Sequence, residues 1–311
     1  MNPDLLIIAP MYAPTLATLD TAYTTHKLWL APDRSAFLAG IADRIEVAIT
    51  TGGIGMDAAL MGALPKLRMI GCFGVGVDAI DVDAATARGI KVTNTPDVLT
   101  EDVADIALAL LLATVRRTAL GDRYVREGKW LTGPMPLTAS VQGKTLGIIG
   151  LGRIGSAIAK RAEAFGMRIA YQGPRKKAVA YAYFADAVAL ADASDVVVAA
   201  CPGGEATRHI VSRAAIEALG AEGVFINIAR GSVVDQDALV EALANKRLGG
   251  AGLDVFNDEP RVPEALLTLD NVVLQPHVGS GTHPTRQAMG QLVIDNLAAW
   301  FAGRPLLTPV N

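Results

Sequence analysis

The chain has 311 residues, of which 51% are hydrophobic and 19% are charged, and its formal net charge is -3. This length is comfortable for two globular domains, and the small negative charge gives no indication of a nucleic-acid or anionic-membrane partner. The longest apolar run covers residues 106–115, whereas a membrane span requires about 20 residues. Cys72 and Cys201 end apolar runs, which is typical of buried free thiols in a reducing compartment. We expect a soluble cytoplasmic protein, and no Cys/His cluster has the spacing of metal ligands.

The first part of the chain alternates between apolar, β-branched stretches and amphipathic stretches with helical spacing. The strand-like stretches lie at residues 5–9, 45–50 and 67–73. Continuous apolar strands indicate burial on both faces of a sheet. Their alternation with helices predicts a parallel sheet with helices packed on it.

This alternation stops after residue 98. Residues 99–126 predict one helix of about 28 residues, far longer than the usual ~11–12. Residues 128–138 are rich in Gly and Pro and contain Trp130. A long helix followed by such a loop indicates the crossing from one domain to the next.

A second alternating block follows, with strand-like stretches at residues 145–149, 167–171, 195–200, 223–228 and 271–274. The last predicted helix, 284–301, comes after this block is complete, so we expect it to return to the first domain. The sequence therefore predicts two Rossmann-like, doubly wound parallel-sheet α/β domains with an active-site cleft between them. The first, discontinuous domain is expected to span 1–98 plus 284–311, and the second to span 99–283.

Two glycine-rich turns are candidates for binding a dinucleotide. Residues 150–155 read GLGRIG, and residues 74–79 read GVGVDA. The turn at 150–155 follows a buried strand and opens a helix, where the backbone can approach a pyrophosphate at the helix N-terminus. A glycine-rich turn without a ligand is the alternative. The turn at 74–79 includes Asp78 and is followed by Asp81 and Asp83, whose carboxylates would repel phosphates, so we expect it to have another role.

The end of the second strand in this βαβ unit indicates which dinucleotide is bound. An NAD site has Asp or Glu about 20 residues into the unit, where it holds the ribose hydroxyls. Residues 171–177 read YQGPRKK and contain no acid. Gln172 removes the repulsion of a 2′-phosphate, and Arg175 and Lys176 attract it. We expect NADP(H) to be preferred over NAD(H). A solvated basic turn is the alternative.

Several longer motifs occur in a distinctive order: FGVGVD at 73–78, NTPDVLTE at 94–101, GIIGLGRIG at 147–155, NIARG at 227–231, GLDVFNDEP at 252–260 and PHVGS at 276–280. In these motifs the chain resembles the D-isomer-specific 2-hydroxyacid dehydrogenases, and within them the NADPH-preferring glyoxylate/hydroxypyruvate reductases. The resemblance covers nearly the whole chain. It implies that the first domain binds substrate and the second binds NADP.

The resemblance assigns the catalytic positions to Arg230, Glu259 and His277. Arg230 is expected to hold the carboxylate of a 2-keto acid and to polarise its keto oxygen. His277 is expected to donate a proton to that oxygen as hydride reaches the α-carbon, and Glu259 to orient the ring and favour its charged form. Each residue alone has a structural alternative, but all three follow strands of one nucleotide-binding domain.

The same resemblance implies further contacts. Substrate is expected to contact Gly74, Val75, Gly76, Arg230 and His277. Cofactor is expected to contact Thr100, Gly150, Gly152, Arg153, Ile154, Gly155, Gln172, Gly173, Pro174, Arg175, Lys176, Cys201, Pro202, Thr207, Ile228, Ala229, Arg230, Asp254, His277 and Gly279. A homodimer is expected. Trp130 either reaches the active site of the partner or is a plain interface or core residue. His209 and His283 are treated as bystanders.

The expected reaction is the NADPH-dependent reduction of glyoxylate and hydroxypyruvate to glycolate and D-glycerate. A glycine-rich segment at 51–55 is unusual for a loop near substrate and favours small or adaptable substrates. One alternative is a dehydrogenase for a bulkier 2-keto acid such as an aryl-pyruvate. An alternative of another class is an NADP(H)-sensing binding protein or co-repressor. The catalytic set argues against that alternative, as does the lack of a tail or basic patch.

Overall fold

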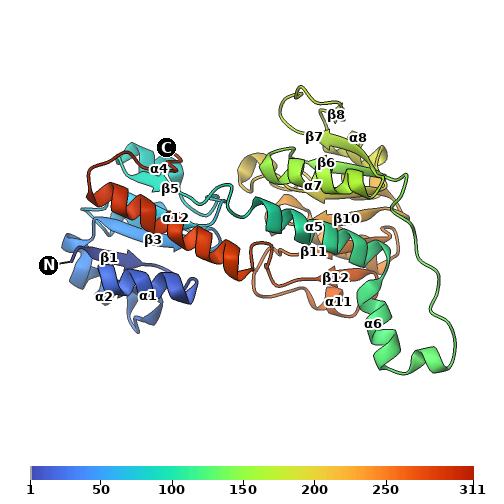
Figure 1. Cartoon of the computed structure of the whole chain (residues 1–311), viewed down its shortest axis with the longest axis horizontal. Helices are drawn as coiled ribbons and strands as arrows, with labels where there is room; N and C mark the ends of the chain where they lie inside the picture. The colour runs from blue at the N-terminus through green and yellow to red at the C-terminus, as the bar shows by residue number, and fades with distance from the viewer. Residues whose placement is uncertain (1) are drawn as a thin grey trace. The chain divides into compact units, whose positions relative to one another are not determined.

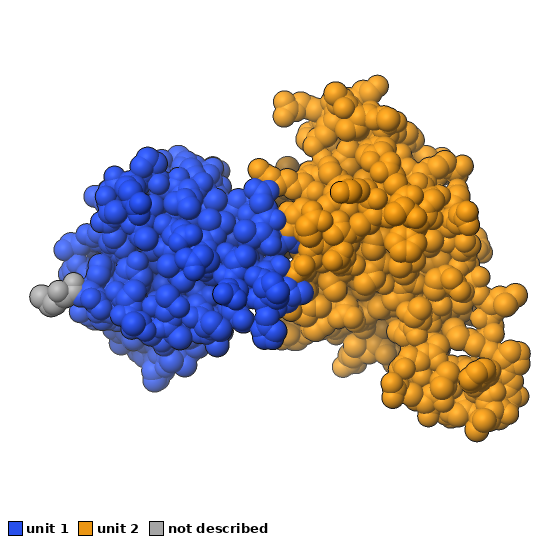
Figure 2. Space-filling model, viewed as in Figure 1, with its two compact units in different colours: residues 1–99, 282–311 blue, residues 100–281 orange. Residues whose placement is uncertain are grey.

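The computed structural model describes residues 2–311, and the chain forms two compact units (Figures 1 and 2). Unit 1 comprises residues 1–99 and 282–311, and unit 2 comprises residues 100–281. The sequence placed the divisions after residues 98 and 283, and the chain divides after residues 99 and 281.

Unit 1 is built on a five-stranded sheet with the strand order β2-β1-β3-β4-β5. All of its strand pairs are parallel. The strands are β1 (Asp4–Ile7), β2 (Thr24–Lys27), β3 (Val47–Thr51), β4 (Met69–Phe73) and β5 (Lys91–Thr93). The helices are α1 (Ala13–Ala22), α2 (Arg34–Ile41), α3 (Ala58–Gly62), α4 (Val82–Ala87) and α12 (His283–Phe301). The central strands are buried, as the continuous apolar runs predicted.

The last helix, α12, belongs to unit 1. It begins after Thr282, whose side chain accepts a hydrogen bond from Thr285 N, and Pro284 lies in its first turn. It packs so closely on α1 that a Cβ atom at Gly290 would lie 1.9 Å from the Thr15 hydroxyl oxygen. This helix therefore makes the first and last parts of the chain one folded body.

Unit 2 contains a seven-stranded sheet with the order β12-β11-β10-β9-β6-β7-β8, again with parallel pairs throughout. Its strands are β6 (Thr145–Ile149), β7 (Arg168–Gln172), β8 (Ala182–Phe184), β9 (Val196–Ala199), β10 (Val224–Asn227), β11 (Gly250–Leu253) and β12 (Val272–Leu274). Its helices are α5 (Thr100–Val115), α6 (Thr118–Arg126), α7 (Arg153–Ala164), α8 (Ala187–Asp192), α9 (Arg213–Leu219), α10 (Gln236–Ala244) and α11 (Glu264–Leu267). Within residues 2–311, no helix combines the length and apolar character needed to cross a bilayer.

The prediction of one helix over residues 99–126 was wrong. Arg117 adopts a left-handed backbone with a φ of +50°, which interrupts the helical hydrogen bonding between α5 and α6. Seven side chains of α5 are buried, whereas none of α6 is. The helix therefore breaks where it stops following the sheet, and α6 projects from the body of unit 2 (Figure 1).

The sequence analysis also missed β2, β5, β8 and β11. The first three are short and lie at sheet edges, where polar residues are tolerated and the apolar signal is weak. Strand β11 is central, but it contains Gly250 and Gly252. A Cβ atom at Gly252 would lie 3.0 Å from Leu110 Cβ of α5. These glycines allow α5 to pack closely on the sheet, and they remove the β-branched pattern that identifies a strand.

Candidate active site

Most of the candidate residues follow adjacent strands at the carboxyl edge of the unit 2 sheet. In the order β12-β11-β10-β9-β6-β7, the strand ends are followed or formed by His277, Asp254, Arg230, Cys201, Gly150 and Gln172. The chain reverses its winding direction between β6 and β9, which are neighbours in the sheet. Ligands of open α/β sheets bind at such a switch point. A dinucleotide placed there with its pyrophosphate at β6 would have its two ends toward β7 and toward β10–β12.

Each glycine of the 150–155 loop has a separate structural role. Gly150 has a φ of +93°, and a Cβ atom there would lie 2.7 Å from the backbone of Cys201. A Cβ atom at Gly155 would lie 2.2 Å from the Gly150 carbonyl oxygen, so this glycine lets α7 pack against β6. At Gly152, by contrast, no heavy atom lies within 4 Å of an added Cβ, and this glycine is the N-cap of the 12-residue α7. The loop therefore fits a pyrophosphate, because it leaves space at a helix N-terminus.

The neighbouring cofactor candidates are distributed around this loop. Arg153 and Ile154 form the first turn of α7, and Thr100 is the first residue of α5. The basic turn follows β7, with Gly173 buried and Pro174, Arg175 and Lys176 exposed. Gln172, half-buried, donates a side-chain hydrogen bond to the Ala185 carbonyl at 3.4 Å.

Beyond the glycine loop, the candidates after β9 and β10 form a mostly buried floor. Cys201, Ile228 and Ala229 are buried. Burial raises the pKa of the Cys201 thiol to about 11, so this cysteine stays protonated and is not a nucleophile. The Thr207 hydroxyl donates to the Pro202 carbonyl at 2.7 Å, which ties the following loop back to the end of β9.

The three catalytic candidates lie together in unit 2. His277 Nδ1 is 2.7 Å from Glu259 Oε2, and the charge of Arg230 is close enough to lower the pKa of Glu259. The other Glu259 oxygen accepts a hydrogen bond from Phe256 N at 3.0 Å. The side chains of His277 and Glu259 are 42% and 33% exposed, so a substrate can reach the ring. With Nδ1 directed at the carboxylate, Nε2 is the ring nitrogen left to face a substrate.

The carboxylates around His277 have opposite pKa shifts. Burial raises the pKa of Glu259, but the hydrogen bond and charge of His277 lower it by more, and the net result is a lowered pKa. Glu259 is therefore ionised at neutral pH and presents a negative charge to the His277 ring. Burial raises the pKa of Asp254, against the opposing effect of two backbone hydrogen bonds.

Asp254 holds the backbone of His277 and of the two residues that follow it. Its two carboxylate oxygens accept hydrogen bonds from Val278 N at 2.7 Å and from Gly279 N at 2.8 Å, and its main-chain carbonyl accepts from His277 N at 2.9 Å. His277 has a φ of +53°, an uncommon backbone for a non-glycine residue. The Asp254 contacts stabilise that backbone and fix where the imidazole projects.

The sequence analysis missed two residues that position Arg230. The fully buried Asn227 side chain donates to the Arg230 carbonyl at 2.9 Å and accepts from Ala229 N at 3.1 Å, which closes the loop after β10. A Cβ atom at Gly231 would lie 2.1 Å from the Phe256 carbonyl carbon. The loops that carry Arg230 and Glu259 therefore touch through backbone at Gly231. Both residues lie in the NIARG motif, where the pattern marked the arginine but not its supports.

The substrate candidates in unit 1 form a turn after β4. Gly74 has a φ of +157°, which side chains rarely allow. Its carbonyl accepts from Thr95 N at 2.9 Å, and the Val75 carbonyl accepts from Asn94 Nδ2 at 2.8 Å. In a trans peptide the N–H group points opposite to the carbonyl. The N–H groups of Val75 and Gly76 are therefore directed away from those supporting contacts, which suits anion binding.

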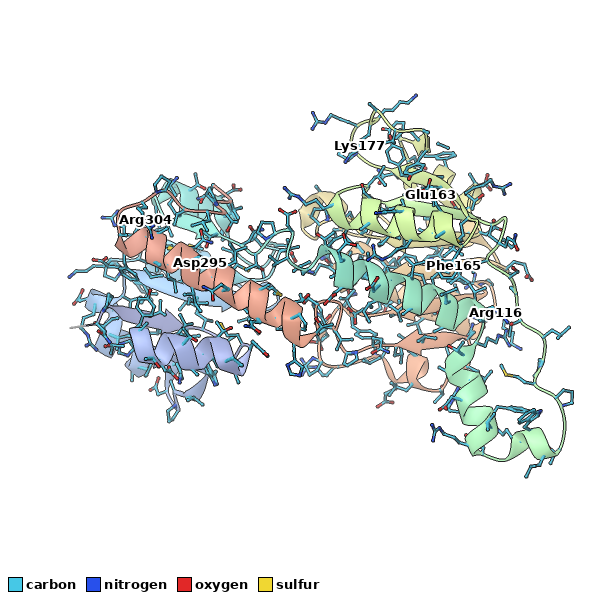
Figure 3. The ribbon with its side chains drawn as sticks, in the orientation of Figure 1. Arg116, Glu163, Phe165, Lys177, Asp295 and Arg304 are labelled. Atoms are coloured by element: carbon cyan, nitrogen blue, oxygen red, sulfur yellow. The ribbon has the colours of Figure 1, made fainter. Side chains whose placement is uncertain are left out.

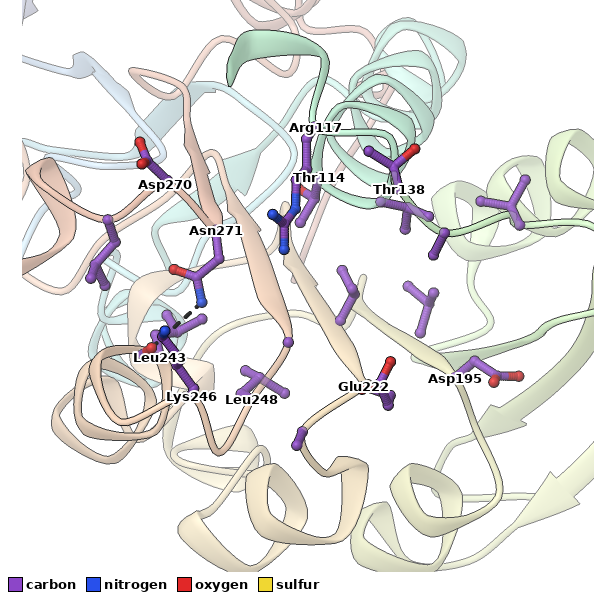
Figure 4. A pocket seen from close by; sticks show the side chains of 18 of the residues that line it. Thr114, Arg117, Thr138, Asp195, Glu222, Leu243, Lys246, Leu248, Asp270 and Asn271 are labelled. Carbon is purple, nitrogen blue, oxygen red and sulfur yellow. Dashed lines mark hydrogen bonds between the residues drawn. The ribbon is translucent and has the colours of Figure 1, made fainter. Parts of the chain in front are cut away.

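The remaining candidates lie apart from these groups. Trp130 is 68% exposed in the η3 turn (Lys129–Leu131) beyond α6. His209 lies in the loop after Thr207, and His283 begins α12 with its Nδ1 3.2 Å from the Tyr12 hydroxyl. A cavity of about 920 Å³ opens at the amino edge of the unit 2 sheet, away from the glycine loop, and Figure 4 shows Arg117, Lys246 and Asp270 around it. Among residues 2–311, no group of three His, Cys, Asp or Glu side chains is arranged to hold a metal.

Comparison with known proteins gives a consistent family. Residues 108–279 match the family model described as D-isomer specific 2-hydroxyacid dehydrogenase, NAD binding domain. The chain is 51% identical to glyoxylate/hydroxypyruvate reductase A of Arabidopsis thaliana and 50% identical to hydroxyphenylpyruvate reductase of Plectranthus scutellarioides, with 98% of each chain covered. A solved structure of the NADPH-dependent glyoxylate/hydroxypyruvate reductase of Sinorhizobium meliloti, in complex with NADP and malonate, aligns with a TM-score of 0.92 at 43% identity, covering 100% of this chain and 97% of that one.

The matched segment contains the glycine-rich loop, the basic turn and the Arg230, Glu259 and His277 set. Its strand order and parallel pairing are those of a nucleotide-binding Rossmann-like domain. The chain is therefore an oxidoreductase, and it belongs to the family of D-isomer-specific 2-hydroxyacid dehydrogenases.

Proposed function

We propose that the protein reduces small 2-keto acids, with glyoxylate and hydroxypyruvate as its substrates and NADPH as its reductant. The observation that carries this proposal is the proximity of Arg230 and the hydrogen-bonded Glu259–His277 pair at the same sheet edge as the glycine-rich loop. The products would be glycolate and D-glycerate. The names of the Arabidopsis and Sinorhizobium relatives support this substrate class.

Arg230 and His277 have complementary roles in the proposed reaction. The planar guanidinium of Arg230 binds the substrate carboxylate and polarises the keto oxygen. His277 donates the Nε2 proton to that oxygen as negative charge develops on it, and Glu259 stabilises the imidazolium beforehand. The nicotinamide, when bound, supplies the hydride for the α-carbon. In the oxidation direction His277 accepts the proton.

We assign cofactor binding to unit 2 and substrate binding chiefly to unit 1. The N–H groups at the start of α7 would hold the pyrophosphate, and Gln172, Arg175 and Lys176 would hold a 2′-phosphate. Gly74, Val75 and Gly76 would bind the substrate carboxylate through backbone N–H groups. Asp254 and Gly279 would lie near the nicotinamide end, since they adjoin His277.

The preference for NADPH is tested by restoring an acid at the end of β7. Gln172→Asp places a carboxylate where a 2′-phosphate would lie, and a like-charge contact near a protein surface costs up to about 4 kcal/mol. The ratio of kcat/KM for NADPH to that for NADH should fall by about tenfold or more. Gln172→Asn is the matched control, because it shortens the side chain without adding charge. An unchanged ratio in Gln172→Asp would contradict our interpretation of this turn.

We also propose a homodimer that uses the segment from α6 to residue 137. Within this segment, Val125, Trp130, Leu131 and Leu137 are 57%, 68%, 92% and 99% exposed. Exposed apolar side chains gathered on one projecting segment are typical of an interface. Sedimentation of the wild-type protein should show a dimer, and the Leu131→Ser dimer should dissociate at a higher protein concentration. A wild-type monomer at micromolar concentration would overturn this proposal.

A panel of 2-keto acids with both cofactors tests the reaction itself. Glyoxylate and hydroxypyruvate should be turned over rapidly with NADPH, measured as loss of its absorbance. Hydroxyphenylpyruvate belongs in the panel, because the relative from Plectranthus acts on an aryl-pyruvate by name and the 51–55 loop leaves open space at Gly53. Tight NADPH binding without turnover of any acid would instead favour the nucleotide-sensing alternative.

A further inference from the structure

The basic turn after β7 is fixed at both ends by two tyrosine hydroxyls. Tyr171, which is 1% exposed, accepts a hydrogen bond from Lys177 N at 2.7 Å. Tyr183, on β8, donates to the Gly173 carbonyl at 3.1 Å. The two rings pack with their centroids 5.3 Å apart. The exposed residues between Gly173 and Lys177 are therefore held between two anchored backbone positions.

Lys177 connects this turn to the glycine-rich loop. Figure 3 labels Lys177 in the loop that follows β7. Its ammonium group donates a hydrogen bond to the carbonyl of Leu151, the residue between Gly150 and Gly152. Leu151 is 3% exposed, so this carbonyl belongs to an ordered part of the loop.

This contact also fixes the direction of a neighbouring donor. The Leu151 carbonyl and the Gly152 N–H belong to one peptide plane and point in opposite directions. With the carbonyl held by Lys177, the Gly152 N–H is directed away from the lysine, at the position where α7 begins and an added Cβ meets no atom within 4 Å. That is the space that the glycine-rich loop leaves for a pyrophosphate.

We propose that Lys177 is a positioning residue that couples the two anion subsites of the dinucleotide site. Its ammonium group orients the Leu151–Gly152 peptide for the pyrophosphate. Its backbone, with Tyr171 and Tyr183, holds Arg175 and Lys176 in place for the 2′-phosphate. The second half rests on the proposed preference for NADP(H), whereas the first half applies to either dinucleotide.

Calorimetric titration of the full-length protein with NADP⁺, NAD⁺ and ADP tests both halves without measuring turnover. Lys177→Met keeps the length of the side chain and removes its charge and donors. The contact that Lys177→Met removes is a hydrogen bond from a charged group. We therefore expect this variant to lower the affinity for NAD⁺ and for ADP by about tenfold, and the affinity for NADP⁺ by more. Lys177→Arg should restore most of the affinity. Lys160→Met, at an exposed position of α7, is the control and should change none of the three.

Tyr183→Phe separates the two halves, since it removes only the hydroxyl that holds Gly173. It should lower the affinity for NADP⁺ by about threefold and leave the affinities for NAD⁺ and ADP unchanged. With saturating cofactor, kcat should be near the wild-type value in every variant, while KM for the cofactor rises. Unchanged affinities in Lys177→Met would overturn the pyrophosphate half, and equal losses for NADP⁺ and NAD⁺ in Tyr183→Phe would overturn the 2′-phosphate half.

The proposed NADPH preference fails separately, if wild-type protein binds NAD⁺ as tightly as NADP⁺. In that case the losses of NAD⁺ and ADP affinity in Lys177→Met still decide the pyrophosphate half. Thermal unfolding of each variant identifies any change that comes from instability instead of from the contact.

Discussion

Two turns with nearly the same glycine pattern follow buried parallel strands, one in each unit. The turn at 150–155 leads directly into α7, whose N-cap is Gly152 and so has no side chain to satisfy its N–H groups. The turn at 74–79 leads to the six-residue α4, where the Asp81 carboxylate accepts from Ala84 N. One helix start is open to an anion, and the other is already capped by a negative charge. The same glycine pattern therefore leaves a helix N-terminus open to an anion only where the following helix has no side-chain cap.

The largest expected effect concerns His277 of unit 2, the residue that we propose as the proton donor. His277→Ala should lower kcat/KM for glyoxylate reduction by about 10³-fold, because it removes the general acid. His283→Ala is the matched control, since His283 is an exposed histidine of unit 1 whose Nδ1 lies 3.2 Å from the Tyr12 hydroxyl. It should stay within about threefold of wild type. Normal turnover in His277→Ala would remove the basis of the proposed mechanism.

A smaller effect is expected from the carboxylate beside that histidine. The pKa of Glu259 is lowered, so its negative charge is present beside the His277 ring at neutral pH. Glu259→Gln keeps the shape and removes the charge, and kcat/KM for reduction should fall by about tenfold or more. Steady-state kinetics of Glu259→Gln at neutral pH measure this loss. A kcat/KM equal to that of the wild type would show that the charge of Glu259 is not needed for reduction.

Two alanine substitutions in the 150–155 turn separate packing from binding. Gly155→Ala forces a Cβ atom into the Gly150 carbonyl and should cost about 1–3 kcal/mol in the free energy of unfolding. Gly152→Ala meets no protein atom within 4 Å, so it should leave that free energy within about 0.5 kcal/mol. It should nevertheless lower the affinity for NADP⁺ by about tenfold, since the methyl group occupies the space left for the pyrophosphate. Denaturant unfolding and calorimetry measure the two quantities; a Gly152→Ala protein that binds NADP⁺ normally would place the cofactor elsewhere.

The elements with a regular pattern of apolar residues could be predicted from the sequence. The elements that depend on packing between distant parts of the chain could not. Strand β6 was predicted with its observed bounds, because a five-residue strand with four buried residues leads straight into the glycine loop. Strand β11 was missed, because close packing of α5 requires glycines where a strand usually has β-branched side chains. The break at Arg117 was missed for a related reason: the sequence shows continued helical spacing, but burial ends at the end of α5.

Within the site, motifs marked the groups that face a ligand and not the groups behind them. Arg230, Glu259 and His277 were identified by resemblance, and the Glu259–His277 contact was expected. Asn227 and Gly231 were not identified, because their roles depend on a loop closing on itself and on a second loop touching it. The role of Lys177 could not be predicted either, because its contact with the Leu151 carbonyl forms only in the folded chain.

The smallest expected effect concerns the turn of unit 1. Asn94 donates to the Val75 carbonyl and so directs the next N–H, that of Gly76, away from the supporting residues. Asn94→Ala removes one hydrogen bond, which is worth about 0.5–1.5 kcal/mol, and should raise KM for glyoxylate by about threefold to tenfold. The affinity for NADP⁺ should not change, because that site is assigned to the other turn. Steady-state kinetics and calorimetry on one preparation decide the matter: a loss of NADP⁺ affinity with an unchanged KM for glyoxylate would reverse the roles assigned to the two turns.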